Sequence, residues 1–159
     1  MPDTRLLLTC GLPGSGKTTL AKALAAERGA VRLTKDDWLW ALGTTPWDTP
    51  TREKVEQQLW ELAQELLRLD LSVVVDFGLW ARVERDELRS VARDLGVGVE
   101  LHHLDVPADE LWRRLDARNA RPPWNHHPIR REDLDGWLPR FQPPDAAELA
   151  LFDLPLESR

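Results

Sequence analysis

The sequence has little cysteine and lacks any long apolar run. Among its 159 residues Cys10 is the single cysteine, so no disulfide can form within the chain, which suits a reducing compartment. No stretch approaches the roughly 20 apolar residues that a membrane-spanning helix needs. Residues 1–5 run directly into a strand-like segment and lack the pattern of a signal peptide. We therefore expect a cytoplasmic protein that makes no use of a membrane.

Tyrosine is absent, although there are eight tryptophans, and positive charge is not in excess. The formal net charge is −6, whereas general nucleic-acid binders present clustered lysine and arginine. Hydrophobic residues make up 42% and charged residues 30%, a composition typical of a globular domain. A chain of this length can bury a core without disulfides. We expect one domain over residues 1–159, and nucleic acid is a less favoured partner.

Short apolar runs alternate with amphipathic helical segments along the chain. The expected strands are 5–10, 31–34, 72–76 and 97–106. The expected helices are 18–28, 38–42, 51–70 (with Thr51 as a possible N-cap), 81–95, one that starts at Pro107, and 131–141. This alternation predicts a doubly wound α/β fold, with a mostly parallel sheet of about five strands and helices on both faces.

The segment from Gly11 to Thr18, Gly-Leu-Pro-Gly-Ser-Gly-Lys-Thr, matches the Walker A pattern and lies between an expected strand and an expected helix. Its glycines let backbone N–H groups converge on an anion at a helix N-terminus. Lys17 can bridge the β- and γ-phosphates, and the Thr18 hydroxyl can bind Mg²⁺. This context argues against a chance glycine-rich turn and predicts a three-layer P-loop NTPase domain that binds ATP, with GTP as the alternative. The expected nucleotide-binding residues are Gly11, Pro13, Gly14, Ser15, Gly16, Lys17, Thr18 and Thr19.

Carboxylates follow two of the expected strands, at the edge where ligands of open α/β sheets bind. Asp36 and Asp37 follow the second strand, and Asp76 ends the third. We expect Asp36 or Asp37 to act as the base for an acceptor hydroxyl, with Asp36 preferred and Asp37 contacting the substrate. Asp76 would help to hold Mg²⁺ together with Thr18. The alternatives are that the aspartate pair caps the next helix and that Asp76 is only a polar strand end.

Arginines lie on and beyond the helix that follows Pro107. Arg114 and Arg118 are four residues apart and share a helix face, and Arg121 follows in an Arg- and Pro-rich lid at about 117–131. Arginines at this place can clamp a transferring phosphoryl group, so we expect Arg114 and Arg118 to be catalytic and Arg121 to bind nucleotide. Pairing with the acids Asp109, Glu110 and Asp116 is the alternative, especially for Arg113. Arg85 is a further candidate on the substrate side.

Several tryptophans fall near expected strand ends or loops and could wall an acceptor pocket, or simply pack in the core. They are Trp38, Trp40, Trp47 and Trp80, of which Trp38 is the preferred substrate-binding candidate. The adjacent histidine pairs, 102–103 and 126–127, do not have the spacing of a zinc site.

Taken together, these segments resemble the P-loop kinases grouped as AAA-type ATPase-like phosphotransferases, akin to polynucleotide 5′-kinase, chloramphenicol phosphotransferase and zeta toxin. The resemblance rests on the Walker A motif and on four further segments in the same order: 35–38, 75–78, 114–119 and 141–144 followed by Glu148. It implies that Asp36 is the base and that Arg118 and Arg121 belong to the lid. Polynucleotide kinases often carry arginine where this chain has Leu39, so a nucleic-acid acceptor is disfavoured.

The expected function is therefore a Mg²⁺-assisted transfer of the γ-phosphoryl group of ATP to a hydroxyl of a small molecule. Two alternatives remain open. One is a 5′-hydroxyl polynucleotide kinase, and the other is a nucleotide-binding regulator with slow NTP hydrolysis.

Overall fold

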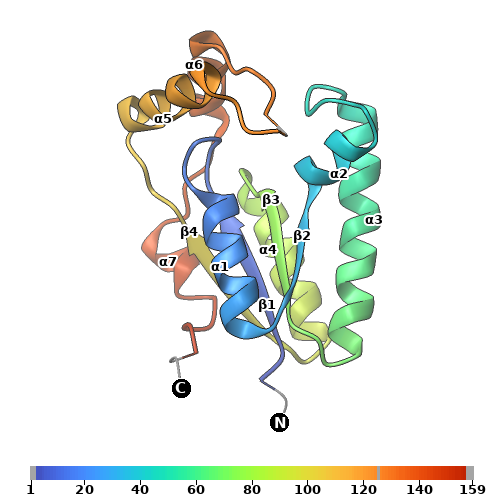
Figure 1. Ribbon diagram of the computed structural model, residues 1–159. Coiled ribbons are helices and arrows are strands. Elements are labelled where there is room, and N and C mark those ends of the chain that lie inside the picture. Colours follow the sequence, from blue (N-terminus) through green and yellow to red (C-terminus); the bar gives the residue numbers. More distant parts are fainter. Residues whose placement is uncertain (1–2, 125, 157–159) are drawn as a thin grey trace.

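A computed structural model describes residues 3–124 and 126–156, in which a four-stranded sheet is flanked by helices (Figure 1). The strands are β1 (Arg5–Cys10), β2 (Val31–Thr34), β3 (Val73–Gly78) and β4 (Gly98–His103). The helices are α1 (Lys17–Arg28), α2 (Lys35–Ala41), α3 (Thr49–Arg68), α4 (Arg82–Asp94), α5 (Ala108–Ala120), α6 (Arg131–Trp137), a 3₁₀ turn at Leu138–Arg140 and α7 (Ala146–Leu149). All strand pairs are parallel, in the order β2-β3-β1-β4. This confirms the expected α/β fold.

The sheet is buried between two helical layers, as its apolar strands predict. Alternate residues of β1 point to opposite faces. Leu6 and Leu8 pack with side chains of α3 and α4, such as Leu59 and Leu88, whereas Leu7 packs with Leu24 of α1. The domain therefore has three layers, with α1 on one face of the sheet and α3 and α4 on the other.

The carboxyl ends of the strands meet at one edge of the sheet, uppermost in Figure 1, and α5 and α6 lie above this edge. A separate apolar cluster joins Leu12, in the loop after β1, to Leu111 and Leu115 of α5 and Leu134 of α6. The order of the strands reverses beside β1, and ligands of such sheets bind outside the carboxyl ends at this point. The loop after β1 and the end of β3 are thus brought together, with α5 held against them.

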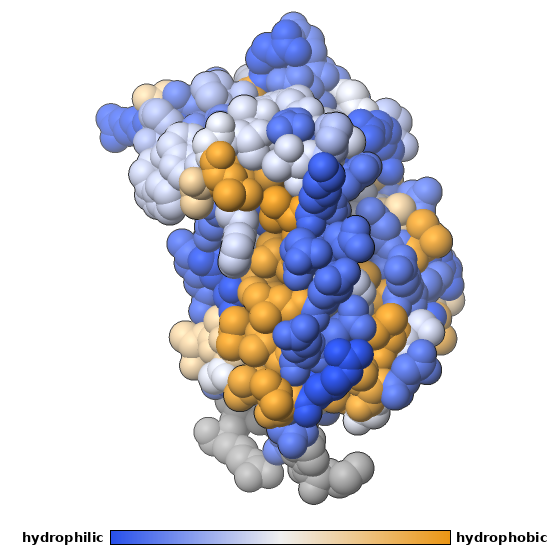
Figure 2. Space-filling view, turned by 90° about the vertical axis from the view of Figure 1, so that its right-hand side faces the viewer, coloured by the Kyte–Doolittle hydropathy of each residue, from blue (hydrophilic) through white to orange (hydrophobic). Residues whose placement is uncertain are grey.

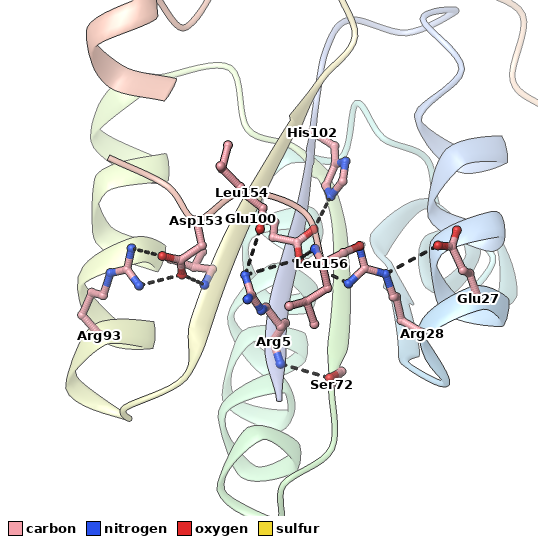
Figure 3. A network of polar contacts seen from close by, with 11 residues as sticks. Arg5, Glu27, Arg28, Ser72, Arg93, Glu100, His102, Asp153, Leu154 and Leu156 are labelled. Carbon is pink, nitrogen blue, oxygen red and sulfur yellow. Dashed lines mark hydrogen bonds and ion pairs between the residues drawn. The ribbon is translucent and has the colours of Figure 1, made fainter. Parts of the chain in front are cut away.

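Within the described residues the sheet has four strands, one fewer than expected. The C-terminal segment that lies beside β4 contacts it at Asp153 but does not form a β-ladder with it. The backbone N–H of Asp153 donates to the Val99 carbonyl at 2.8 Å, and the Asp153 carboxylate accepts from the Val99 N–H at 2.8 Å. Arg93 holds the same carboxylate at 2.7 Å (Figure 3). The Asp153 carboxylate accepts the hydrogen bond that a backbone carbonyl would accept in a β-ladder, so this segment covers the edge of β4 without adding a strand.

Glu100, buried at 1% exposure on β4, fastens the following residues of this C-terminal segment (Figure 3). Its carboxylate lies 3.5 Å from the Arg5 guanidinium, 3.4 Å from that of Arg28 and 2.9 Å from His102 Nε2. The two arginines in turn donate to backbone carbonyls of the segment at 3.2 and 3.1 Å. Because a buried carboxylate needs such partners, the network both satisfies Glu100 and pins residues 154–156.

The start of α3 differs from the sequence-based expectation. The helix begins at Thr49 and its N-cap is Asp48, whose carboxylate accepts from the Thr51 N–H at 3.3 Å. Thr51 is therefore not the cap, because Pro50 is well placed within the first helical turn and the helix starts before it. No helix in the described part of the chain is long and apolar enough to cross a membrane.

Candidate active site

The loop between β1 and α1 has the shape of an anion-binding cradle. Gly14 and Gly16 adopt φ values of 85° and 94°, which L-residues rarely adopt. A Cβ at Gly14 would lie 3.0 Å from Leu115 Cγ of α5, so this glycine also allows α5 to approach. Ser15 is 3% exposed, and its buried hydroxyl oxygen has no hydrogen-bond partner within the described structure. An unpaired buried hydroxyl beside a helix N-terminus fits a bound phosphate.

Lys17, Thr18 and Asp76 meet at this cradle. The Thr18 hydroxyl donates to Asp76 Oδ2 at 3.1 Å, and Thr9 donates to Oδ1 at 2.9 Å. Lys17 Nζ donates to the Leu12 carbonyl at 3.2 Å. A threonine hydroxyl next to a carboxylate near the end of a strand is an oxygen donor set that suits Mg²⁺, so Thr18 and Asp76 could hold this ion. Within residues 3–124 and 126–156, no cluster of three or more His, Cys, Asp or Glu side chains has the arrangement of a metal site.

Lys17 and Asp36 influence each other electrostatically. Burial lowers the pKa of Lys17, and the charges of Asp76 and Asp36 oppose this shift. Burial also raises the pKa of Asp36, against the charges of Lys35 and Lys17. Asp36 is exposed at the start of α2, so its carboxylate is open to solvent beside the strand ends. The Walker A lysine and the expected base therefore lie at one site.

Lys35 links the elements around Asp36, a role that the sequence analysis did not assign. Its Nζ donates to Glu56 of α3 at 2.7 Å and to the carbonyl of Phe77, at the end of β3, at 2.8 Å. The start of α2 is thereby tied to α3 and to the strand that carries Asp76. In the sequence, Lys35 stands out only because it directly precedes the aspartate pair. Its partner Glu56 is distant in sequence, so the pairing could not be predicted.

The faces of α2 separate the side chains that follow Asp36. Successive helical residues are about 100° apart, so Trp40 shares the face of Asp36 and Trp38 lies on the opposite side. Trp38 is 48% exposed and lines a hollow against α3. Trp38 therefore stays a prediction as a substrate-binding residue, and Trp40 is the tryptophan on the same face of α2 as Asp36. Asp37 lies between these faces and pairs with Arg32 at 3.0 Å.

Aromatic side chains of the segment after α5 contact α2 and the loop after it. The ring of Trp40 lies 6.0 Å from that of Trp124 and 5.0 Å from that of His127, measured between centroids. His127 also contacts Trp47, at 6.2 Å. These four rings join Trp124 and His127 to the side of the site that carries Asp36.

The expected lid arginines occupy different positions along α5. Arg114 Nη1 donates to the carbonyls of Gly14 and Ser15 at 3.3 and 3.4 Å, so this guanidinium lies against the P-loop. Arg118 lies one turn further along α5, and Arg121 lies just beyond the helix. Both are exposed, as are Pro122 and Pro123 after them, and as is Thr19 in the first turn of α1.

Arg113 binds an acid on its own helix. Its guanidinium donates to both oxygens of Glu110 at 2.7 Å, and Arg114 Nε donates to the same carboxylate at 2.9 Å. Hydrogen bonds from Arg113 and then Arg114 lower the pKa of Glu110 to about 2. Arg113 therefore pairs with an acid of its own helix, which was the alternative to a role in phosphate binding. Arg114 both pairs with Glu110 and contacts the P-loop.

Arg85 does not lie in an acceptor pocket, which corrects the expectation that it binds substrate. Its side chain is 0% exposed and forms an ion pair of 2.6 Å with Glu148, also buried. A further nitrogen donates to the Leu79 carbonyl at 2.8 Å. Leu79 adopts a left-handed φ of 50° directly after Gly78, whose carbonyl accepts from the Gly11 N–H at 3.1 Å. Arg85 thus supports the turn on which the P-loop rests.

Comparison with known families identifies the chain. A profile of the family described as AAA domain matches residues 6–144. The chain belongs to this AAA-domain family. Its expected kinship with P-loop kinases is confirmed by the family and by the fold of its structural neighbours. None of the curated proteins compared with the chain matches it significantly.

Three solved structures illustrate this shared fold. The Pnkp1/Rnl/Hen1 RNA repair complex contains a chain that is 21% identical, with a TM-score of 0.74 over 86% of this AAA-domain protein but only 43% of its own length. A proposed kinase from Chloroflexus aurantiacus is 21% identical, with a TM-score of 0.72 over 90% of this chain and 82% of its own. The APS kinase CysC of Mycobacterium tuberculosis, solved with AMPPNP and APS, is 24% identical, with a TM-score of 0.58 over 74% of both chains. The AAA-domain protein thus spans less than half of the first of these chains.

Proposed function

We propose that this AAA-domain protein is a P-loop kinase that transfers the γ-phosphoryl group of ATP to a hydroxyl group of a small molecule. The observation that carries the proposal is the phosphate cradle: the buried Ser15 hydroxyl has no partner within the described structure, and the Thr18 hydroxyl donates to Asp76 at 3.1 Å. Asp36 lies near enough for its charge to act on Lys17 of the same loop. Phosphoryl transfer needs a phosphate cradle and a group that receives or orients the acceptor proton at the same place.

Each side chain has a role in this proposal. The P-loop amides and Lys17 bind the phosphates of the donor, and Arg114, next to the carbonyl of Gly14, stabilises charge on the transferring group. Asp36 accepts the proton of the acceptor hydroxyl, and its raised pKa makes the carboxylate a stronger base. When bound by Thr18 and Asp76, Mg²⁺ would neutralise charge on the phosphates. Arg118 and Arg121, exposed at the end of α5 and beyond it, would close over the nucleotide.

The acceptor would bind on the Asp36 side of the lid. Trp40 is one helical turn from Asp36 and contacts Trp124 and His127, and His127 in turn contacts Trp47. Aromatic rings with polar edges suit a small organic acceptor. Asp37 would contact this acceptor from the same end of α2. One protein domain over residues 1–159, with its lid at about 117–131, would hold both substrates.

ATP is the proposed donor, since a neighbour of the same fold was solved with the ATP analogue AMPPNP, and GTP is the alternative. The test is transfer of label from γ-labelled ATP, with Mg²⁺, to a panel of hydroxylated metabolites and antibiotics, with labelled GTP in parallel. We expect labelled product with at least one small acceptor and none with Lys17→Ala. Nucleotide binding without transfer to any acceptor would contradict the proposal and would favour a regulator with slow hydrolysis.

A 5′-hydroxyl polynucleotide kinase is a second candidate, supported by the fold similarity to a chain of an RNA repair complex. The net charge of −6 weighs against it, because oligonucleotide binding draws on many cationic contacts. Oligonucleotides with 5′-hydroxyl ends belong in the same panel. Faster labelling of these ends than of every small acceptor would decide for this candidate.

A further inference from the structure

A hollow of about 570 Å³ lies on the outer side of α2 and α3. Its lining comes from Trp38 of α2, from Leu42 directly after α2 and from α3 residues between Thr51 and Glu65, and it includes no residue of the P-loop. Figure 2 views the molecule from this side and shows apolar surface (orange) beside a polar strip. Leu42 is 61% exposed and Leu69, at the end of α3, is 70% exposed. Large exposed apolar patches are typical of protein interfaces.

The lining residues of α3 are arranged evenly about Gln58. Thr51 and Glu65 lie seven positions to either side, and Lys54 and Leu62 lie four positions to either side. In an antiparallel pair of identical helices centred on Gln58, residues at equal distances from the centre face each other. The lining of the hollow would therefore face itself in a second copy of the chain, as a two-fold interface requires.

The charges of the lining are complementary under the same rotation. Lys54 stands toward the N-terminal end of the hollow, and Glu61 and Glu65 stand toward the C-terminal end. Lys54 of one copy would lie opposite Leu62 of the second copy, between its two glutamates. A parallel arrangement would instead place like charges together, which is unfavourable.

The apolar residues match in the same way. Trp38 and Leu42 stand beside the N-terminal half of α3, and Leu62 lines its C-terminal half. The two-fold rotation brings the first pair over Leu62 of the second copy and close to the exposed Leu69. Apolar side chains that are now in water would then be buried on both copies.

We propose that the α2–α3 hollow is the interface of a symmetric dimer of this protein, formed by antiparallel α3 helices with Lys54 paired to Glu61 and Glu65 of the second copy. The interface lies on the side of α2 opposite to Asp36, so the proposal does not depend on the proposed function. A dimer formed in this way also braces α2 from outside, because Trp38 and Leu42 become buried.

The test is charge reversal followed by analytical ultracentrifugation over a range of protein concentrations. Lys54→Glu places like charges together at two symmetric positions, and we expect it to raise the dimer dissociation constant about tenfold or more. Adding Glu61→Lys and Glu65→Lys restores opposite charges and should restore the dimer. Lys22→Glu, an exposed site on α1, makes the same charge change as a matched control and should leave the dimer intact.

Three results would overturn the proposal: a wild-type chain that stays monomeric at all concentrations, a dimer that Lys54→Glu does not weaken, or a triple variant that stays as weak as the single one. Circular dichroism of each variant shows whether it is folded. A second variant, Leu42→Asp, removes apolar contact without relying on ion pairs, and it should also dissociate the dimer.

Discussion

Replacing Arg85 with methionine removes a guanidinium whose three nitrogens all donate within the protein. Nε and Nη2 donate to the carboxylate of Glu148 at 2.6 and 3.0 Å. Nη1 donates to the carbonyls of Leu79 and Trp80 at 2.8 and 3.1 Å, and Nη2 also donates to the Gln142 carbonyl at 2.8 Å. Methionine fills much of the same volume but donates to none of these oxygens. The variant leaves Glu148 as a buried charge without its partner.

The expected loss of stability follows from this burial. Breaking a buried ion pair by removing one partner costs about 3–5 kcal/mol, a large part of the roughly 5–15 kcal/mol by which ordinary domains are stable. We therefore expect Arg85→Met to lower the free energy of unfolding by about 3–5 kcal/mol. The double variant with Glu148→Leu removes both charges and should recover part of this loss.

Urea denaturation followed by tryptophan fluorescence measures these changes. Arg82→Met is the matched control, because Arg82 lies on the same helix and both it and its partner Asp86, at 3.5 Å, are partly exposed. Exposed ion pairs contribute about 0–1 kcal/mol, so this control should change little. A loss for Arg85→Met no larger than that for Arg82→Met would refute the structural role assigned to Arg85.

Three further predictions concern the site. Lys35→Met removes a charge that lowers the pKa of Asp36, so this pKa should rise further and the acid limb of the pH profile of kcat/KM should move to higher pH; an unmoved limb would contradict it. Thr18→Ala should weaken ATP binding in Mg²⁺ about tenfold or more by calorimetry, with little change in EDTA, and equal loss in both buffers would remove Thr18 as a metal ligand. Gly14→Ala places a Cβ at a strained φ and against α5, so it should lower the free energy of unfolding in urea by about 2–4 kcal/mol. The control Gly43→Ala has a positive φ but open surroundings and should lower it by about 1–2 kcal/mol. Equal losses in the two variants would argue against the close approach of α5.

Local patterns predicted the fold and the phosphate cradle, because each depends on residues close together in the chain. The Walker A segment and its flanking strand and helix lie where the sequence placed them, and Asp76 lies on β3, which continues two residues further than expected, to Gly78. The apolar content of the chain led us to expect a fifth strand, which is not found in the described residues. Asp153 binds β4 through its side chain instead of extending a ladder, a choice that depends on Arg93, which is distant in sequence.

Other features of the site depend on the direction of a side chain or on a partner distant in sequence. Which of Trp38 and Trp40 shares the face of Asp36 depends on where α2 begins, and a helix of this length carries no apolar pattern that predicts its start. Arg85 lies on a helix after a strand-end acid, as a substrate-binding arginine would, and Glu148, 63 residues later, turns it inward. Such pairings arise only once the chain is folded.

The central claim is that Asp36 acts as the base beside a P-loop that binds the donor. Asp36→Asn keeps the size of the side chain and removes its basicity. With the acceptor identified by the panel, its turnover number should fall about 10²–10⁴-fold at saturating Mg²⁺ and ATP, while the dissociation constant for ATP stays the same. An Asp36→Asn variant that binds ATP normally and transfers phosphate at the wild-type rate would contradict the account.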